Sequence, residues 1–247
     1  NKKLSKDNLI ITSHSKKKKL IDICDYNNLE KYIKKNKIDY LINCSGQYSE
    51  NLKKFKSTAI AGNRNIIRIA KKYDIKIILC STTSIYENEK SNYSKTKLFV
   101  ESLYKKSKID YKILRIGNVY DTFLKKKGLL RNIKHYFNNK LNRLVINNPN
   151  IYRNFIHIED FCNLVLLSLN SWKKTRKKIF VLSTENIKIS KILSHFAKKY
   201  PSKKLKGQKL IIRNIQESSI FVKKSMFAYR YFKYTKSTYL LKTIKNL

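Results

Sequence analysis

Short apolar runs alternate along this chain with longer segments in which apolar side chains recur at helical spacing. The runs predict strands at 9–12, 20–24, 40–44, 75–81, 111–119 and 178–182. The spaced segments predict helices at 28–35, 57–73, 93–106, 129–138, 159–172 and 190–200. Several strand runs are apolar throughout, which is typical of a parallel sheet covered by helices on both faces. The pattern therefore predicts a doubly wound α/β fold, with a small mixed lobe over the last forty residues, where the alternation fades.

Composition sets broad limits on what this chain can be. A hydrophobic fraction of 42% with 12% aromatic residues is typical of a globular protein. No apolar run reaches the roughly 18 residues of a membrane helix, so we expect no membrane span. The cysteines (Cys24, Cys44, Cys80 and Cys162) form no C-x-x-C pair, so we expect free thiols, no metal site and a cytoplasmic location.

The formal net charge of +40 allows two explanations. Clustered cations bind nucleic acid or another polyanion by displacing counterions. Alternatively, the charge reflects compositional drift, since lysine far outnumbers arginine and is spread along the whole chain. A nucleic-acid surface usually favours arginine, whose planar fork grips phosphate and bases. Both explanations remain open, and drift is the one that we favour.

Tyr93 and Lys97 form a Y-x-x-x-K motif, a spacing that also occurs at five other tyrosines of this chain. Only Tyr93 opens a predicted helix that follows an apolar strand ending in hydroxyl side chains, among them Thr82. Residues four apart share a helix face, so we expect the Lys97 ammonium to lie near the Tyr93 oxygen and to lower the tyrosine pKa. Such a tyrosine exchanges protons with a substrate hydroxyl, while a Ser or Thr hydroxyl at the end of the preceding strand holds the same oxygen. The alternatives are a solvated helix face and a threonine that only caps the strand end.

Six further segments carry motifs: 20–25 (D-[LI]-x-D), 41–46 (a strand and small-residue turn), 62–67 (G-T-x-N-[LI]), 81–86 (S-S-x-x-V-Y-G), 115–120 (R-x-x-N-V-Y-G) and 153–160 (R-D-F-[IV]-[HY]-V-x-D). In this order they resemble the motifs of the NAD-dependent epimerase/dehydratase family, the extended short-chain dehydrogenases. The resemblance implies a Rossmann-like fold. It also implies a dinucleotide-binding domain over 1–122 and a substrate-binding lobe over 123–247, of which 151–185 returns to the core.

The resemblance also implies site residues. Thr82, Tyr93 and Lys97 would be catalytic, and Asn118 and Arg153 would join Thr82 in binding substrate. The cofactor-binding residues would be Asp22, Ile23, Cys44, Ser45, Gly46, Tyr93 and Lys97. Three of these assignments have a simpler alternative: a surface acid for Asp22, a turn cap for Asn118, and for Arg153 a salt bridge to an acid such as Asp160.

The chain departs from the family pattern at several positions. No glycine precedes Gly46, so the first strand and its glycine-rich phosphate loop are missing, and we expect a further 20–30 residues or so upstream. Glu87 and Asp121 replace glycines, Ala59 replaces an asparagine, and only six residues separate Tyr86 from Tyr93. Serine and lysine at 13–19 suit the 2′-phosphate of NADP, yet the lysine bias leaves NAD or NADP open as the cofactor.

The sequence thus predicts an NAD(P)-dependent epimerase, dehydratase or reductase that acts on a sugar nucleotide. The alternative is a non-catalytic relative that serves as a basic subunit or binds RNA, for which the charge itself would be functional. A homodimer is compatible with either hypothesis.

Overall fold

The computed structural model describes residues 21–45, 52–87, 91–125, 128–174, 178–201, 208–213, 215, 217, 219–223, 226–235 and 238–247, without the side chains of 52–58. The chain divides into two compact units. One comprises Asn1–Leu79 with Leu98–Tyr111, and the other comprises Cys80–Lys97 with Lys112–Leu247. The predicted strand at 9–12 and the segment at 13–19 lie outside the described residues.

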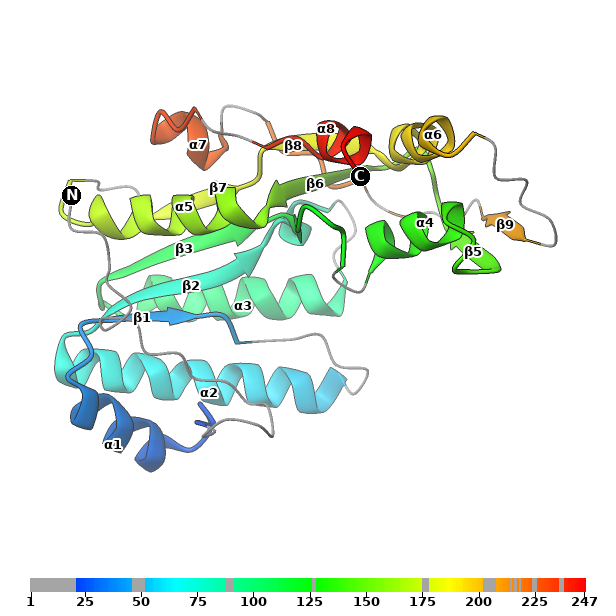
Figure 1. The fold of residues 1–247 in the computed structure, drawn as a ribbon. Coiled ribbons are helices and arrows are strands. Elements are labelled where there is room, and N and C mark those ends of the chain that lie inside the picture. The colour runs from blue at the N-terminus through cyan, green and yellow to red at the C-terminus, as the bar shows by residue number, and fades with distance from the viewer. Residues whose placement is uncertain are drawn as a thin grey trace. The chain divides into compact units, whose positions relative to one another are not determined.

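The described part of the first unit contains two whole helices, the later part of α3 (Asn92–Lys106) and a parallel strand pair (Figure 1). Helix α1 (Tyr26–Asn36) begins after Asp25, whose carboxylate accepts the Asn28 N–H. Strand β1 (Tyr40–Asn43) pairs in parallel with the first part of β2 (Lys76–Thr82), and α2 (Leu52–Tyr73) connects the two strands. This strand–helix–strand unit is what the alternating pattern predicts.

The predicted strand at 20–24 is wrong over its described part, which forms a turn instead. Asp22 Oδ1 accepts the Cys24 N–H at 2.8 Å, and the Asp22 carbonyl accepts the Asp25 N–H at 3.1 Å. Aspartate competes with the strand ladder for backbone donors in this way, so the apolar run alone overstated the strand.

The second unit contains a parallel pair and a mixed three-stranded sheet (Figure 1). Strand β3 (Tyr111–Ile116) pairs with β7 (Ile179–Leu182). The mixed sheet has the order β4-β6-β8, formed by Asn118–Tyr120, Tyr152–His157 and Glu185–Lys188.

The predicted strand at 111–119 is therefore broken at Gly117, where the chain stops pairing with β7 and begins to pair with β6. The Gly117 N–H still donates to the Leu182 carbonyl, whereas Asn118 opposite Phe155 begins the next ladder. A Cβ on Gly117 would lie only 3.2 Å from Asn154 Cβ, so the two backbones approach too closely for any other residue to fit without a shift.

Helices α4, α6 and α8 and strand β5, which pairs with β9, contribute buried side chains to the main apolar core of the second unit (Figure 1). Their bounds are Leu129–Phe137, Ile189–Lys199, Leu240–Lys245, Arg143–Ile146 and Lys209–Ile212. Helices α3 (Asn92–Lys106), α5 (Ile158–Asn170) and α7 (Ala228–Tyr231) complete the described helices, with a 3-10 turn at Thr83–Tyr86. The main predicted helices are confirmed. The sequence pattern missed β5, β6, β8, β9, α7 and α8.

No helix in the described part of the chain is long and apolar enough to cross a bilayer. Among the same residues, histidines, cysteines and acids form no group of three that could hold a metal ion.

Candidate active site

Thr82 ends β2 and starts the 3-10 turn that follows. Its backbone is extended, with φ −136° and ψ 151°, and its hydroxyl oxygen accepts the Ser84 N–H at 3.1 Å. The same side chain is hydrogen-bonded to the side chain of Tyr93. Thr82 is thus both the strand-end cap and a partner of the tyrosine, because its oxygen carries two lone pairs and a rotatable proton.

Tyr93 lies in the first turn of α3, and serines fix that turn. The Ser91 hydroxyl accepts the Ser94 N–H at 3.2 Å, and the Ser91 carbonyl accepts the Lys95 N–H at 2.9 Å, so Ser91 acts as the helix cap. Ser94 is fully buried, and the side chain of Tyr93 is partly exposed. The cap therefore fixes the backbone of the turn that carries Tyr93.

Lys97 lies one helical turn after Tyr93 and is buried, with an exposed fraction of 7%. Its ammonium donates to the Cys80 carbonyl at 3.3 Å and lies 5.9 Å from the centre of the Tyr93 ring. The structure thus brings together Thr82, Tyr93 and Lys97 within the second unit, as the spacing predicted.

The pKa of Tyr93 is raised, whereas the nearby lysine was expected to lower it. Burial raises the pKa of the phenol, and the hydrogen bond with Thr82 opposes that rise only in part. The physical reason is that the Lys97 ammonium donates to the Cys80 carbonyl while the phenol loses hydration. In this state of the protein Tyr93 is therefore a protonated acid rather than a phenolate.

Arg153, on β6, is paired with an acid that sequence reasoning did not identify. Its guanidinium donates to Glu217 Oε2 at 3.1 Å, and Glu217 Oε1 accepts the Asn147 amide at 2.7 Å. The expected partner Asp160 instead accepts the Tyr234 hydroxyl and the Thr238 N–H. Burial lowers the pKa of Arg153, and the charges of Glu217 and Glu87 oppose that shift.

Glu87 is the second acid near Arg153, at the position where the resembled family has glycine. The Ser94 hydroxyl donates to Glu87 Oε2 at 3.3 Å, and the Ser91 N–H also donates to this carboxylate. Burial raises the pKa of Glu87, and the charge of Arg153 counteracts this. One carboxylate therefore neighbours both the first turn of α3 and the arginine.

Asn118 and Asp121 have backbone roles in this structure. The Asn118 amide donates to the Asn154 carbonyl at 3.0 Å, and the side chain is exposed at the start of β4. Asp121 Oδ1 accepts the Phe123 N–H at 2.9 Å, so this glycine replacement stabilises a turn. Arg115 Nη1 donates to the Tyr86 hydroxyl at 2.8 Å, a contact that joins two of the recognised motifs.

The predicted cofactor residues of the first unit lie in two turns. Asp22 is exposed, and Ile23 packs on Gly62, where a Cβ would lie 2.3 Å from Ile23 Cδ1. The Asn65 amide of α2 donates to the Ile23 carbonyl at 3.0 Å and fixes this turn. Ile23 is therefore fixed next to Asp22, whose carboxylate is exposed to solvent. An apolar side chain next to a hydrogen-bond acceptor is a pair that could contact an adenosine.

The second turn follows β1. Ser45 donates its hydroxyl to Asn43 Oδ1 at 2.6 Å, and Cys44 is exposed. Asn43 is buried and donates to Asn63 Oδ1, which also accepts the Tyr104 hydroxyl. Gly46 lies outside the described residues. This polar network holds the end of β1 in place.

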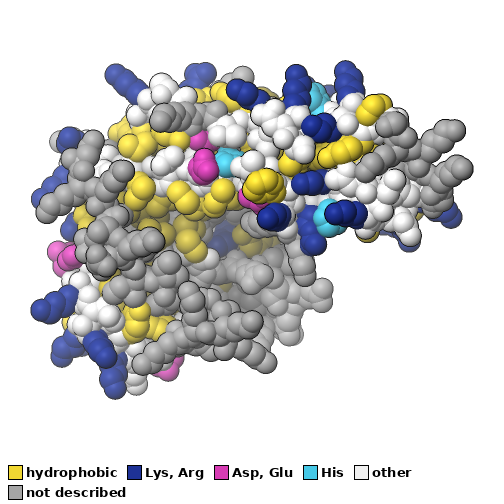
Figure 2. Space-filling view, viewed as in Figure 1, with side chains coloured by type: hydrophobic (Ala, Val, Ile, Leu, Met, Phe, Trp, Pro, Cys, Tyr) yellow, Lys and Arg dark blue, Asp and Glu magenta, His cyan; other side chains and the backbone are white. Residues whose placement is uncertain are grey.

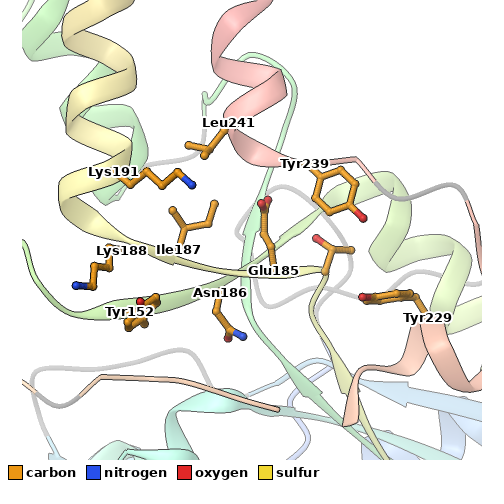
Figure 3. Close-up of a pocket in the computed structure, with 10 residues that line it drawn as sticks. Tyr152, Glu185, Asn186, Ile187, Lys188, Lys191, Tyr229, Tyr239 and Leu241 are labelled. Atoms are coloured by element: carbon orange, nitrogen blue, oxygen red, sulfur yellow. The ribbon is translucent and has the colours of Figure 1, made fainter. Parts of the chain in front are cut away.

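A separate open pocket of about 390 Å³ lies around β8 (Figure 3). The Glu185 side chain points to the side of β8 on which Lys191 of α6 and Leu241 of α8 lie. The side chains of Asn186 and Lys188 point to the other side of the strand. Burial raises the pKa of Glu185 to about 7, and its carboxylate accepts the Leu240 N–H at the start of α8. None of the predicted site residues lines this pocket.

Comparison with solved structures shows the fold. The chain resembles the Bordetella bronchiseptica enzyme WbmG in complex with NAD and UDP, with a TM-score of 0.75, 16% identity, and coverage of 91% of this chain and 76% of that one. It resembles the L-threonine dehydrogenase of Phytophthora infestans, with a TM-score of 0.75, 14% identity, and coverage of 92% and 83%. It also resembles the NAD complex of the Thermus thermophilus UDP-glucose 4-epimerase, with a TM-score of 0.69, 15% identity, and coverage of 98% of this chain and 85% of that one.

These likenesses confirm the predicted α/β fold with its parallel strands. No curated protein sequence matches the chain. A family model, described as the NAD dependent epimerase/dehydratase family, matches residues 4–183, which is well over half of the chain. The chain therefore belongs to the NAD-dependent epimerase/dehydratase family.

Proposed function

We propose that this protein uses NAD or NADP to epimerise, dehydrate or reduce the sugar of a nucleotide-diphosphate sugar. The observation that carries the proposal is the meeting of Thr82, Tyr93 and Lys97 at the end of β2 and the first turn of α3. Family membership supports the redox chemistry, and the NAD and UDP bound to WbmG support a sugar-nucleotide substrate.

Tyr93 is the acid/base of the proposed reaction. Its phenol gives a proton to, or takes one from, a substrate oxygen that the Thr82 hydroxyl also holds. Because burial raises the pKa of Tyr93, the phenolate forms only when positive charge offsets the lost hydration. Lys97 supplies that charge at the next turn of the helix, and its ammonium would also hold the ribose of a bound cofactor. A bound nicotinamide would supply the hydride acceptor or donor.

The remaining site residues keep their predicted roles as part of this proposal. Asp22 and Ile23 would contact adenine, and the turn at Cys44, Ser45 and Gly46 would lie beside the cofactor. Asn118 and Arg153 would bind substrate, and Arg153 would take the diphosphate. The dinucleotide-binding domain would span 1–122 and the substrate lobe 123–247.

The experiment is turnover of UDP-glucose by the purified protein with NAD or NADP, followed by absorbance at 340 nm and by product analysis for epimerisation. Tyr93→Phe should lower kcat by about 10²–10⁴-fold, since it removes the proton-transfer group. Tyr229→Phe is the matched control, because Tyr229 and Lys233 have the same spacing in a different part of the chain. Equal activity of Tyr93→Phe and wild type would overturn the proposal.

The non-catalytic alternative makes a different prediction. Figure 2 shows Lys and Arg side chains scattered over the visible face rather than gathered into one stripe, as compositional drift predicts. Tight, salt-dependent binding to RNA without any cofactor-dependent turnover would favour that alternative instead.

A further inference from the structure

The open pocket of about 390 Å³ around β8 lies within the second unit (Figure 3). Its volume is in the range of small-molecule sites, which combine apolar surface with a few well-placed polar groups. Thr82, Tyr93 and Lys97 do not line it. A ligand bound there would therefore use a different set of residues from the proposed reaction.

Two polar side chains of the pocket already serve the fold. The Thr184 hydroxyl donates to the Phe155 carbonyl at 3.2 Å. The Asn186 amide nitrogen donates to the Val222 carbonyl at 2.9 Å, and its oxygen accepts the Val222 N–H at 3.3 Å. These bonds join β8 to β6 and to the segment at Val222, so the protein itself fixes this wall of the pocket.

Glu185 is the polar group of the pocket that the fold uses only in part. One of its carboxylate oxygens accepts the Leu240 N–H, and within the described residues no donor is bonded to the other oxygen. The side chain is partly exposed and points to the side of β8 on which Lys191 lies, so a ligand in the pocket can reach it. A hydroxyl that donates to this carboxylate forms a charge-assisted hydrogen bond.

The charges that line the pocket favour a neutral ligand. On the Glu185 side of β8, the carboxylate lies with the exposed ammonium of Lys191. Lys188 points to the other side of the strand, where its ammonium lies 5.5 Å from the centre of the Tyr152 ring. An anion would meet the carboxylate, and a cation would meet the Lys191 ammonium. Neutral hydroxyl groups can instead donate to the one and accept from the other.

Tyr239 adds an aromatic ring to the lining of the same pocket. Its side chain is 45% exposed, so part of the ring surface is available to a ligand. The face of an aromatic ring carries partial negative charge and attracts C–H groups. A pyranose ring presents C–H groups on its faces and hydroxyl groups around its edge, which matches a ring beside a carboxylate and an ammonium.

We propose that the pocket around β8 is a binding site for an uncharged saccharide, separate from the candidate active site. Glu185 accepts one hydroxyl of the saccharide, Lys191 donates to another, and Tyr239 contacts its C–H groups. The inference goes beyond the proposed function and does not rest on it, because none of these three residues takes part in the proposed reaction.

NMR titration of the purified protein tests the site, with glucose, galactose, N-acetylglucosamine, maltose and cellobiose as the probes at pH 8. At least one saccharide should bind with a Kd on the order of 1 mM. Glu185→Gln should weaken this binding about three- to tenfold, because a neutral acceptor replaces a charged one while the oxygen for the Leu240 N–H is kept. Tyr239→Ala should weaken it by a similar factor of about three to ten. Tyr40→Ala is the matched control and should bind as wild type does, since Tyr40 is 41% exposed and does not line the pocket.

The pH dependence of binding gives a second readout. Burial raises the pKa of Glu185 to about 7, so the carboxylate is roughly 10% ionised at pH 6 and roughly 90% ionised at pH 8. A ligand hydroxyl that donates to the ionised form should therefore bind up to about tenfold more tightly at pH 8 than at pH 6. Glu185→Gln should show no such rise, and it leaves unchanged the titratable neighbours of Glu185, which are Lys191, Tyr120 and Tyr239.

Three results would overturn the inference. The first is that no saccharide of the panel binds with a Kd below about 20 mM. The second is a saccharide affinity that is the same in wild type, Glu185→Gln and Tyr239→Ala, which would place the bound sugar elsewhere. The third is Glu185-dependent binding of inorganic phosphate or putrescine that is tighter than that of every saccharide, because the pocket would then select a charged ligand.

Discussion

Glu185 should make the stability of this protein depend on pH in a way that one substitution removes. The carboxylate lies in the pocket around β8, accepts the Leu240 N–H, and has a pKa raised by burial to about 7 from an ordinary value of 4.5 (Figure 3). A raised pKa means that the folded state holds the proton more tightly than the unfolded state. The contribution of Glu185 to stability is therefore fully present below its pKa in the unfolded state, and it is lost as the pH rises through its pKa in the folded state.

The size of the effect follows from the shift. About 2.5 pKa units at 1.36 kcal/mol each gives roughly 3 kcal/mol as an upper value, and partial solvent access reduces it to about 2 kcal/mol. Glu185→Gln keeps an oxygen for the Leu240 N–H and cannot ionise. At pH 8 the variant should thus be about 2 kcal/mol more stable than wild type, and near pH 4.5 the two should be nearly equal.

Urea unfolding at pH 4.5, 6, 7 and 8, followed by circular dichroism, measures the difference between the two proteins. The comparison isolates Glu185, because every other titrating group is shared. The corresponding rise in Tm at pH 8 is about 4–8 °C for a chain of this size. A difference that does not change with pH, or a variant that is less stable at pH 8, would refute the reasoning.

Three further substitutions test the site and its supports. Lys97→Met should lower kcat by at least about tenfold with little change in the circular dichroism spectrum, because Tyr93 loses the charge that favours its phenolate, and unchanged turnover would contradict this role. Asn63→Ala should cost about 1–3 kcal/mol of unfolding free energy in urea, because it removes the buried oxygen that accepts both the Asn43 amide and the Tyr104 hydroxyl. Gly117→Ala should cost about 1–3 kcal/mol, because the new Cβ meets Asn154 at 3.2 Å, and a neutral result in the same assay would show that β6 can shift.

The sequence by itself determined the elements whose side-chain spacing is set locally. The apolar run at 75–81 and the helical pattern at 93–106 agree with β2 and α3 to within one residue at each end. Tyr93 and Lys97 share a face because a helix repeats every 3.6 residues, and this face was predictable without knowledge of distant contacts. Thr82 is one of four successive hydroxyl residues at the end of the strand before, and the family resemblance singled it out.

Tertiary structure decided whatever depends on distant neighbours or on burial. Glu217 meets Arg153 across 64 residues, and no local pattern in the irregular C-terminal region indicates that pairing. The rise in the pKa of Tyr93 comes from lost hydration, which only the packed structure sets, so reasoning from Lys97 alone gave the opposite direction. Likewise, the turn at Asp22 and the break at Gly117 follow from hydrogen bonds and close backbone contacts, to which hydrophobic periodicity is insensitive.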